Sequence, residues 1–178
     1  MGHNHLRVYR DLDDVEVVAV CEPDERLRAS IASRYGVKAY ASHEELLARE
    51  RPDAISVTSP TSTHFRIVSD ALASSCHVLV EKPIAATLEE ATGLVRLAER
   101  SGRVVMVGHI ERYNPAIQQL TSRLRSGSLG RIYEMHARRL GPFPARIRDV
   151  GVVIDLATMT STSCECSARP RPNGSTPR

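Results

Sequence analysis

Short apolar runs alternate with amphipathic stretches along the first 107 residues of the chain. The apolar runs have the length of buried strands and occupy residues 15–21, 37–40, 54–58, 77–80 and 104–107. Between them, apolar residues recur at helical spacing over residues 5–12, 24–35, 43–50, 63–74 and 87–101. Alternation of near-continuous apolar strands with helices predicts an α/β fold with a doubly wound parallel sheet.

Polar and glycine residues at the ends of these stretches support the predicted helices. Ser42 and Thr87 stand where a helix begins, and their hydroxyls can accept a hydrogen bond from a helical amide. Gly36 and Gly102 stand where a helix ends, in a position that favours left-handed backbone.

The pattern changes after Gly108. A helix is predicted over 114–125, and residues 131–140 alternate like a long half-exposed strand. We therefore expect one domain over residues 1–112 and the start of a second, α+β domain over residues 113–158.

Composition narrows the class of protein. The chain has 178 residues, of which 42% are hydrophobic and 25% charged, as in soluble globular proteins. A net charge of +3 does not indicate nucleic-acid binding, and no apolar run reaches the roughly 20 residues that span a membrane. The four cysteines are too sparse for a disulfide framework, and no secretory signal is visible. We expect a cytoplasmic protein with neither nucleic acid nor membrane as a partner.

The first residues resemble part of a phosphate-binding motif. Dinucleotide-binding sheets begin with a strand, G-x-G-x-x-G and a helix, and an acidic residue about 20 positions later binds a ribose. Gly2 fits the third glycine and Glu22 fits the acid, whereas the strand before the helix is missing. We expect a sheet that lacks its first strand, between the strands at 15–21 and 54–58. The alternative is an ordinary helix start and a solvated Glu22.

Three further segments have a specific order along the chain. They are Thr-Ser-Pro-Thr-Ser-Thr-His at 58–64, Glu-Lys-Pro at 81–83, and Gly-His-Ile-Glu-Arg-Tyr-Asn-Pro at 108–115. Over residues 1–158 the chain thereby resembles the Gfo/Idh/MocA family of NAD(P)-dependent oxidoreductases, in particular its UDP-N-acetylglucosamine 3-dehydrogenases and inositol dehydrogenases. The resemblance implies a Rossmann domain over residues 1–112, then a substrate and oligomerisation domain. It also implies hydride transfer from a sugar or polyol secondary alcohol.

The predicted cofactor site lies at the carboxyl ends of the strands, where open α/β sheets bind ligands. The resemblance implies that Lys82 lies beside the nicotinamide and the substrate hydroxyl, where a cation stabilises a developing alkoxide. The predicted cofactor-binding residues are Gly2, Glu22, Thr58, Ser59, Pro60, His64, Glu81 and Lys82. The alternatives are a partly exposed helix-start histidine for His64 and an exposed surface lysine for Lys82.

The cofactor expected is NAD, because the Glu22 carboxylate would repel the 2′-phosphate of NADP. NADP stays open because Arg26 lies one helical turn further on.

The predicted catalytic residues are Lys82 and Asp155. In the family an Asp and a His four residues later lie on one helix face and supply the base that hydride transfer needs. Asp155 matches the Asp, but Met159 stands at the His position and cannot accept a proton. We therefore expect this chain to be inactive as written: a fragment of a dehydrogenase or, alternatively, a non-catalytic nucleotide-binding fragment or pseudo-enzyme. No metal site is predicted, including at Cys164-x-Cys166.

Residues 159–178 have no periodic apolar face and are rich in Ser, Thr, Pro and Arg. A low-complexity tail explains this composition. A shifted reading frame also explains it: for one choice of codons, an extra cytosine after Thr158 yields His-Asp-Ile-Asp-Leu-Met-Arg-Val, an amphipathic helix with His at 159. We expect a non-native or disordered tail, a small-molecule sugar or polyol as the partner, and homo-oligomers among intact relatives.

Overall fold

The computed structural model describes residues 1–134, 136, 138 and 161. The chain divides into two compact units, Met1–Gly108 and His109–Arg178. The division therefore falls after Gly108, and the sequence pattern placed it after residue 112.

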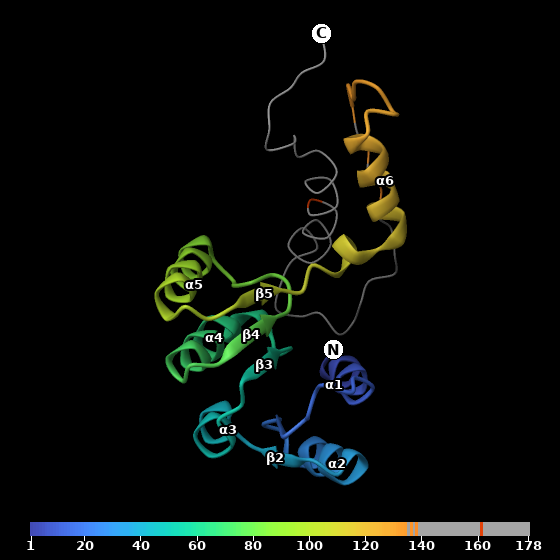
Figure 1. Cartoon of the computed structure of the whole chain (residues 1–178). Helices are drawn as coiled ribbons and strands as arrows, with labels where there is room; N and C mark the ends of the chain where they lie inside the picture. Colours follow the sequence, from blue (N-terminus) through green and yellow to red (C-terminus); the bar gives the residue numbers. More distant parts are fainter. Residues whose placement is uncertain (135, 137, 139–160, 162–178) are drawn as a thin grey trace. The chain divides into compact units, whose positions relative to one another are not determined.

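The first unit alternates strands with helices from end to end (Figure 1). Its elements are α1 (Gly2–Arg10), β1 (Ala19–Cys21), α2 (Glu25–Tyr35), β2 (Lys38–Tyr40), α3 (His43–Glu50), β3 (Ala54–Val57), the 3-10 turn η1 (Thr61–Thr63), α4 (His64–Ala73), β4 (His77–Val80), α5 (Leu88–Ser101) and β5 (Val105–Val107). The predicted helix over 63–74 is thus preceded by a 3-10 turn.

The strands form two parallel sheets. β1 pairs with β2, and β3, β4 and β5 pair in that order. Among the described residues no ladder joins β1 to β3, which is where the absent first strand was expected. The predicted α/β fold with parallel Rossmann-type strands is confirmed.

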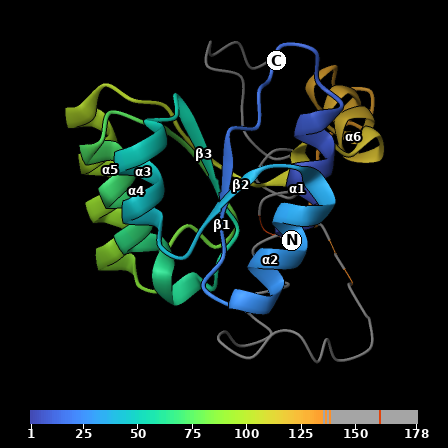
Figure 2. The ribbon, with the colours of Figure 1, turned by 90° about the horizontal axis from the view of Figure 1, so that it is seen from below.

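Helices cover both faces of the strands, as in a doubly wound fold. Helices α3, α4 and α5 lie on one side, and α1 and α2 lie on the other (Figure 2). A parallel sheet covered in this way needs apolar residues on both faces of its strands, which accounts for their near-continuous apolar sequences.

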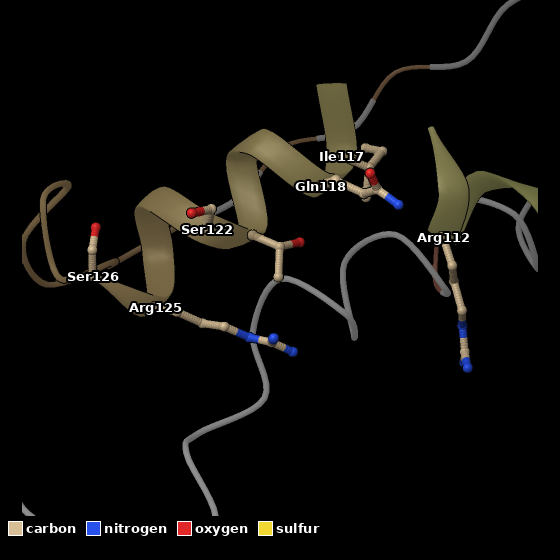
Figure 3. Close-up of a pocket in the computed structure, with 7 residues that line it drawn as sticks. Arg112, Ile117, Gln118, Ser122, Arg125 and Ser126 are labelled. Carbon is tan, nitrogen blue, oxygen red and sulfur yellow. The ribbon is translucent and has the colours of Figure 1, made fainter. Parts of the chain in front are cut away.

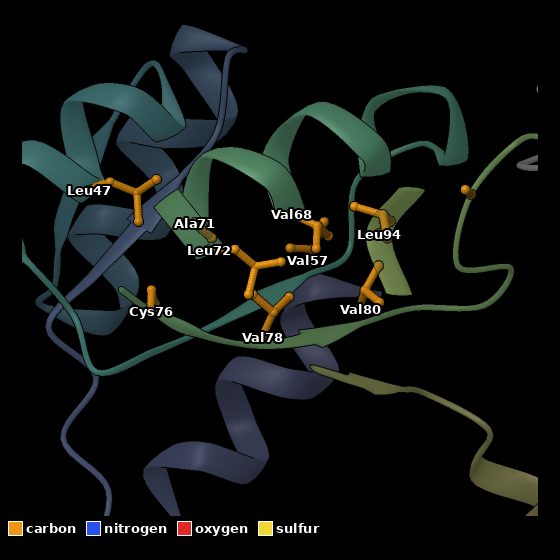
Figure 4. Packing of buried hydrophobic residues seen from close by; sticks show 10 residues of the cluster. Leu47, Val57, Val68, Ala71, Leu72, Cys76, Val78, Val80 and Leu94 are labelled. Atoms are coloured by element: carbon orange, nitrogen blue, oxygen red, sulfur yellow. The ribbon is translucent and has the colours of Figure 1, made fainter. Parts of the chain in front are cut away.

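The hydrophobic core lies between α4, α5 and the larger sheet (Figure 4). Val68, Val80 and Leu94 are fully buried at 0% exposure. Removing side chains of this size from water stabilises the fold by about 1.5–3 kcal/mol each. The smaller sheet is less buried, because α2 contributes no buried residue and β1 is half-buried or exposed. Stability is therefore concentrated around β3–β5.

Capping residues set the helix boundaries as predicted. The Ser42 and Thr87 hydroxyls accept hydrogen bonds from the amides of Glu45 and Glu90, each at 3.2 Å. Gly36 and Gly102 end α2 and α5 with φ of 63°.

Two predicted strands differ in the structure. The strand expected over 15–21 is regular only over Ala19–Cys21, where it pairs with the three residues of β2. Residues 131–134 have no regular secondary structure, and most of the strand expected over 131–140 lies outside the described residues.

The second unit begins with η2 (Ile110–Tyr113) and α6 (Pro115–Arg125). The Asn114 side chain caps α6 by accepting a hydrogen bond from the Ala116 amide at 3.0 Å. None of the helices in the described residues is long and apolar enough to span a membrane.

Two leucines of α5 test where the core lies. Leu94 is fully buried and Leu88 is 77% exposed. Leu94→Ala should lower the free energy of unfolding by about 2–5 kcal/mol, since it removes buried methyl groups and leaves a cavity. Leu88→Ala, the matched control, should change it by less than about 0.5 kcal/mol. Urea denaturation followed by circular dichroism measures both, and equal effects of the two substitutions would contradict this core.

Candidate functional site

The segments that follow β3 and β4 begin side by side. The two strands are parallel and paired in register, with Val57 opposite Val80. The Glu81 amide then donates to the Val57 carbonyl at 2.9 Å, and the Gly108 amide donates to the Val80 carbonyl at 2.8 Å. Three consecutive strand ends therefore meet at one edge of the sheet, which is where open α/β sheets bind ligands.

The amino end of α1 reaches this edge. A Cβ added to Gly2 would lie 3.1 Å from Thr58 Oγ1, so only a glycine fits here without movement of its neighbour. The first amides of a helix have no partner within the helix and attract anions. Gly2 and Thr58, two predicted cofactor residues far apart in sequence, are thus brought together at a surface suited to a phosphate.

His5, one turn into α1, links this helix to the sheet. Its Nδ1 lies 2.7 Å from Ser56 Oγ, and its Nε2 lies 2.9 Å from Glu81 Oε1. One neutral tautomer satisfies both contacts, with Nε2–H donating to the carboxylate and Nδ1 accepting from the hydroxyl. Sequence reasoning missed His5. The sequence feature that could have identified His5 is its position three residues after Gly2, on the same face of the helix.

The Glu81 carboxylate is turned toward protein groups. It is 8% exposed, and besides His5 it accepts a hydrogen bond from the Lys82 amide at 3.3 Å. A Cβ on Gly108 would lie 3.3 Å from its carboxyl carbon, so Gly108 leaves the space that this side chain fills. Glu81 therefore belongs to the framework of the site, and its predicted contact with a cofactor stays a prediction.

His64 connects the two strand-end segments. Its Nε2 lies 3.0 Å from the Ser59 carbonyl oxygen, and its Nδ1 lies 2.9 Å from the Pro83 carbonyl oxygen. Carbonyl oxygens only accept hydrogen bonds, so a neutral ring satisfies one contact and a protonated ring satisfies both. The alternative of a partly exposed histidine is wrong, because His64 is 1% exposed.

Lys82 lies between Glu81 and Pro83 and is half-buried rather than exposed on the surface. The bond from Lys82 to Pro83 is a cis peptide. On the neighbouring segment Thr58 and Ser59 are half-buried, whereas Pro60 is exposed. The structure thus gathers Lys82 with Thr58 and Ser59 at one edge.

Glu22 stands apart from these contacts, at the end of β1 in the smaller sheet. Its amide donates to the Tyr40 carbonyl at 3.0 Å, and its side chain accepts from the Asp24 amide at 3.0 Å. Asp24 caps α2, so the turn that holds Glu22 is well defined. Arg26 is exposed. Asp155 and Met159 lie outside the described residues.

The two cysteines described by the structure have different environments. Cys21 precedes Glu22 and is exposed, whereas Cys76 is buried. Burial raises the pKa of the Cys76 thiol to about 11, with a further contribution from Asp53. Desolvation, followed by the Glu22 and Glu44 carboxylates, raises the pKa of the Cys21 thiol.

One group of possible metal ligands occurs in the described part of the chain, away from this edge. It comprises His43, Glu44 and Asp70, whose ligand atoms lie within 4.8 Å of one another. Arg66 forms ion pairs with Glu44 and Asp70, and the His43 ring contacts both carboxylates. The Arg66 guanidinium therefore already neutralises carboxylate charge at the place where a metal ion would bind.

A groove of about 520 Å³ lies along α6 in the second unit (Figure 3). It is lined by Arg112, Ile117, Gln118, Thr121, Ser122, Arg125 and Ser126. None of these residues was predicted as a site residue.

Comparison with known proteins bears on the family and the fold. The model of the Gfo/Idh/MocA family, described as an oxidoreductase family with an NAD-binding Rossmann fold, matches residues 1–109. The chain is 34% identical over 156 residues to UDP-N-acetylglucosamine 3-dehydrogenase of Acidithiobacillus ferrooxidans, covering 88% of this chain and 47% of that protein. It is also 34% identical to D-glucoside 3-dehydrogenase of Escherichia coli, covering 76% of this chain and 39% of that protein. The chain thus spans less than half the length of these relatives.

Solved structures show the same fold. GenD2 from gentamicin A biosynthesis, in complex with NAD, superposes with a TM-score of 0.83 at 25% identity, covering 94% of this chain and 50% of that one. The WlbA dehydrogenase from Chromobacterium violaceum, in complex with NADH and UDP-GlcNAcA, superposes with a TM-score of 0.71 at 26% identity, covering 74% of this chain and 39% of that one.

Proposed function

The chain belongs to the Gfo/Idh/MocA family of oxidoreductases, whose Rossmann fold binds NAD, and on this premise we propose that its first unit holds the dinucleotide at the carboxyl edge of β3 and β4. The expected family and its NAD cofactor are thereby confirmed. The proposal assigns the reaction as hydride transfer between a secondary alcohol of a sugar or polyol and the nicotinamide.

The observation that carries this proposal is the meeting of three segments at one sheet edge. Gly2 approaches Thr58. His64 bridges Ser59 and Pro83, so Lys82 stands next to the segment that follows β3. The amino end of α1 would hold the pyrophosphate, and Thr58, Ser59 and Lys82 would hold the rest of the cofactor toward its nicotinamide.

Glu22 fits the adenosine end of the cofactor. Its half-buried carboxylate stands at the end of β1, in a turn fixed by the Asp24 amide. A carboxylate at such a position accepts hydrogen bonds from the ribose hydroxyls of NAD and repels the 2′-phosphate of NADP. We therefore propose NAD rather than NADP for this chain.

Lys82 supplies the chemistry at the other end of the cofactor. A bound nicotinamide would accept the hydride, a base would accept the hydroxyl proton, and negative charge would develop on the alcohol oxygen. A lysine ammonium beside that oxygen stabilises the charge. Asp155 as a partner in proton transfer remains a prediction from the sequence.

Two relatives support the proposed substrate class. They are a UDP-N-acetylglucosamine 3-dehydrogenase and a D-glucoside 3-dehydrogenase, both named for oxidation of a sugar at position 3. We propose that the site recognises a sugar secondary alcohol, in a free or nucleotide-linked sugar, which it could oxidise only with a base at the position of Met159.

The exposed Cys21 allows a direct test of cofactor binding. A ribose held by Glu22 would shield the adjacent thiol, whereas the buried Cys76 serves as an internal reference. With NAD at about ten times its Kd, maleimide labelling of Cys21 should slow roughly tenfold, since about one chain in eleven stays unliganded. Peptide mass spectrometry measures both sites. Gly2→Val should abolish the protection by moving Thr58, and an unchanged labelling rate in the unsubstituted chain would refute the proposed site.

A second candidate, a nucleotide-binding module without turnover, is favoured by Met159 at the expected position of the base. Mixing the chain with NAD and UDP-N-acetylglucosamine, and following NADH absorbance, separates the two. We expect NAD binding without NADH formation, because methionine cannot accept the hydroxyl proton. Formation of NADH by the unsubstituted chain, together with its loss in Lys82→Met, would instead establish an active dehydrogenase. That result would exclude the binding module.

A further inference from the structure

Both neighbours of Lys82 in the chain are anchored by histidines. On one side, the Glu81 carboxylate lies 2.9 Å from His5 Nε2. On the other side, the Pro83 carbonyl oxygen lies 2.9 Å from His64 Nδ1. His5 belongs to α1 and His64 to α4, which lie on opposite faces of the strands (Figure 2). The backbone on both sides of Lys82 is therefore held by contacts from helices on both faces of the strands.

Each histidine also makes a second contact, and that contact is to β3 or to the segment that follows it. His5 Nδ1 lies 2.7 Å from Ser56 Oγ, and His64 Nε2 lies 3.0 Å from the Ser59 carbonyl oxygen. Each ring thus connects β3, or the segment that follows it, to the segment that contains Lys82. Together the two rings link the β3 side of the proposed cofactor site to the segment that contains Lys82.

These contacts leave neither ring a nitrogen for the cofactor. An imidazole has two nitrogens, and in both histidines each nitrogen faces a protein partner. His64 is 1% exposed, and the His5 side chain is 18% exposed. The burial shields the hydrogen bonds from water and strengthens them. The geometry therefore assigns both ring nitrogens of each histidine to protein groups, and the predicted contact of His64 with a cofactor stays a prediction.

We propose that His5 and His64 are positioning residues, which set the place of Lys82 relative to the Thr58–Ser59 segment. The inference rests on the proposed function for the role given to Lys82, and on the distances alone for the anchoring. Position matters here because a displacement of about 1 Å in a reacting group can cost roughly a hundredfold in rate. A lysine on a free turn would sample many such displacements.

Hydrogen exchange measured by mass spectrometry tests the anchoring without any ligand. The readout is exchange in the peptide 81–86, normalised to exchange in α5 of the same variant so that a general loss of stability cancels. His5→Gln and His64→Gln should each accelerate exchange in this peptide roughly fivefold, as the loss of one hydrogen bond predicts. Val68→Ala is the matched control, because Val68 is fully buried on the same helix as His64. It should leave the normalised rate unchanged.

Two histidine variants are used so that the test still gives a result if one of them does not fold. His64 is buried and its replacement places the fold at risk, whereas His5 is partly exposed and lies on a different helix. If His64→Gln does not fold, His5→Gln still decides the question. Normalised exchange in 81–86 that matches the Val68→Ala control in every folded variant would overturn the proposal.

NAD affinity separates positioning from a merely structural role. At a temperature where each variant is folded, His5→Gln and His64→Gln should weaken NAD binding at least about threefold, because the segment that contains Lys82 loses a link to the β3 side of the site. Val68→Ala should leave the NAD affinity unchanged, even where it lowers Tm as much as a histidine variant does. Unchanged affinity in the histidine variants contradicts positioning. Absence of NAD binding by the unsubstituted chain would refute the proposed function instead, and the exchange data would still decide the anchoring.

Discussion

The in-register parallel pairing of β3 with β4 is the constraint on which the site depends. Because Val57 lies opposite Val80, both strands end at the same level, and the segments that follow start as neighbours. The buried core between α4, α5 and these strands stabilises the pairing, with Val68, Val80 and Leu94 excluded from water. The apolar core thus fixes where the polar site begins, and His5 and His64 then fix its finer geometry.

Much of the fold and the outline of the site could be predicted from local sequence. Apolar runs located the strands, and Ser42, Thr87 and Gly102 located helix ends, because such signals act over a few residues. The role of His5 could not be predicted in this way. Its contact with Glu81 joins residues 76 positions apart and depends on how α1 crosses the sheet. Strand order can place a residue at an edge, but it does not determine the direction of the side chain.

The two parts of the first unit contribute differently to the proposed function. Lys82 follows a strand of the larger sheet, near the buried His64, where packing is dense. The smaller sheet holds Glu22, and α2 beside it buries none of its residues. Segments with few buried apolar contacts open at low free-energy cost. The proposed site around Lys82 is therefore more firmly held than the proposed ribose site around Glu22.

A titration of the isotope-labelled chain with NAD, followed by amide NMR, tests the shared crevice most directly. The account predicts that the largest shift changes fall on Gly2, Thr58, Ser59 and Lys82, and that Glu22 responds at the same NAD concentrations. Changes confined to the α6 groove, or no changes at NAD concentrations in the millimolar range, would contradict it.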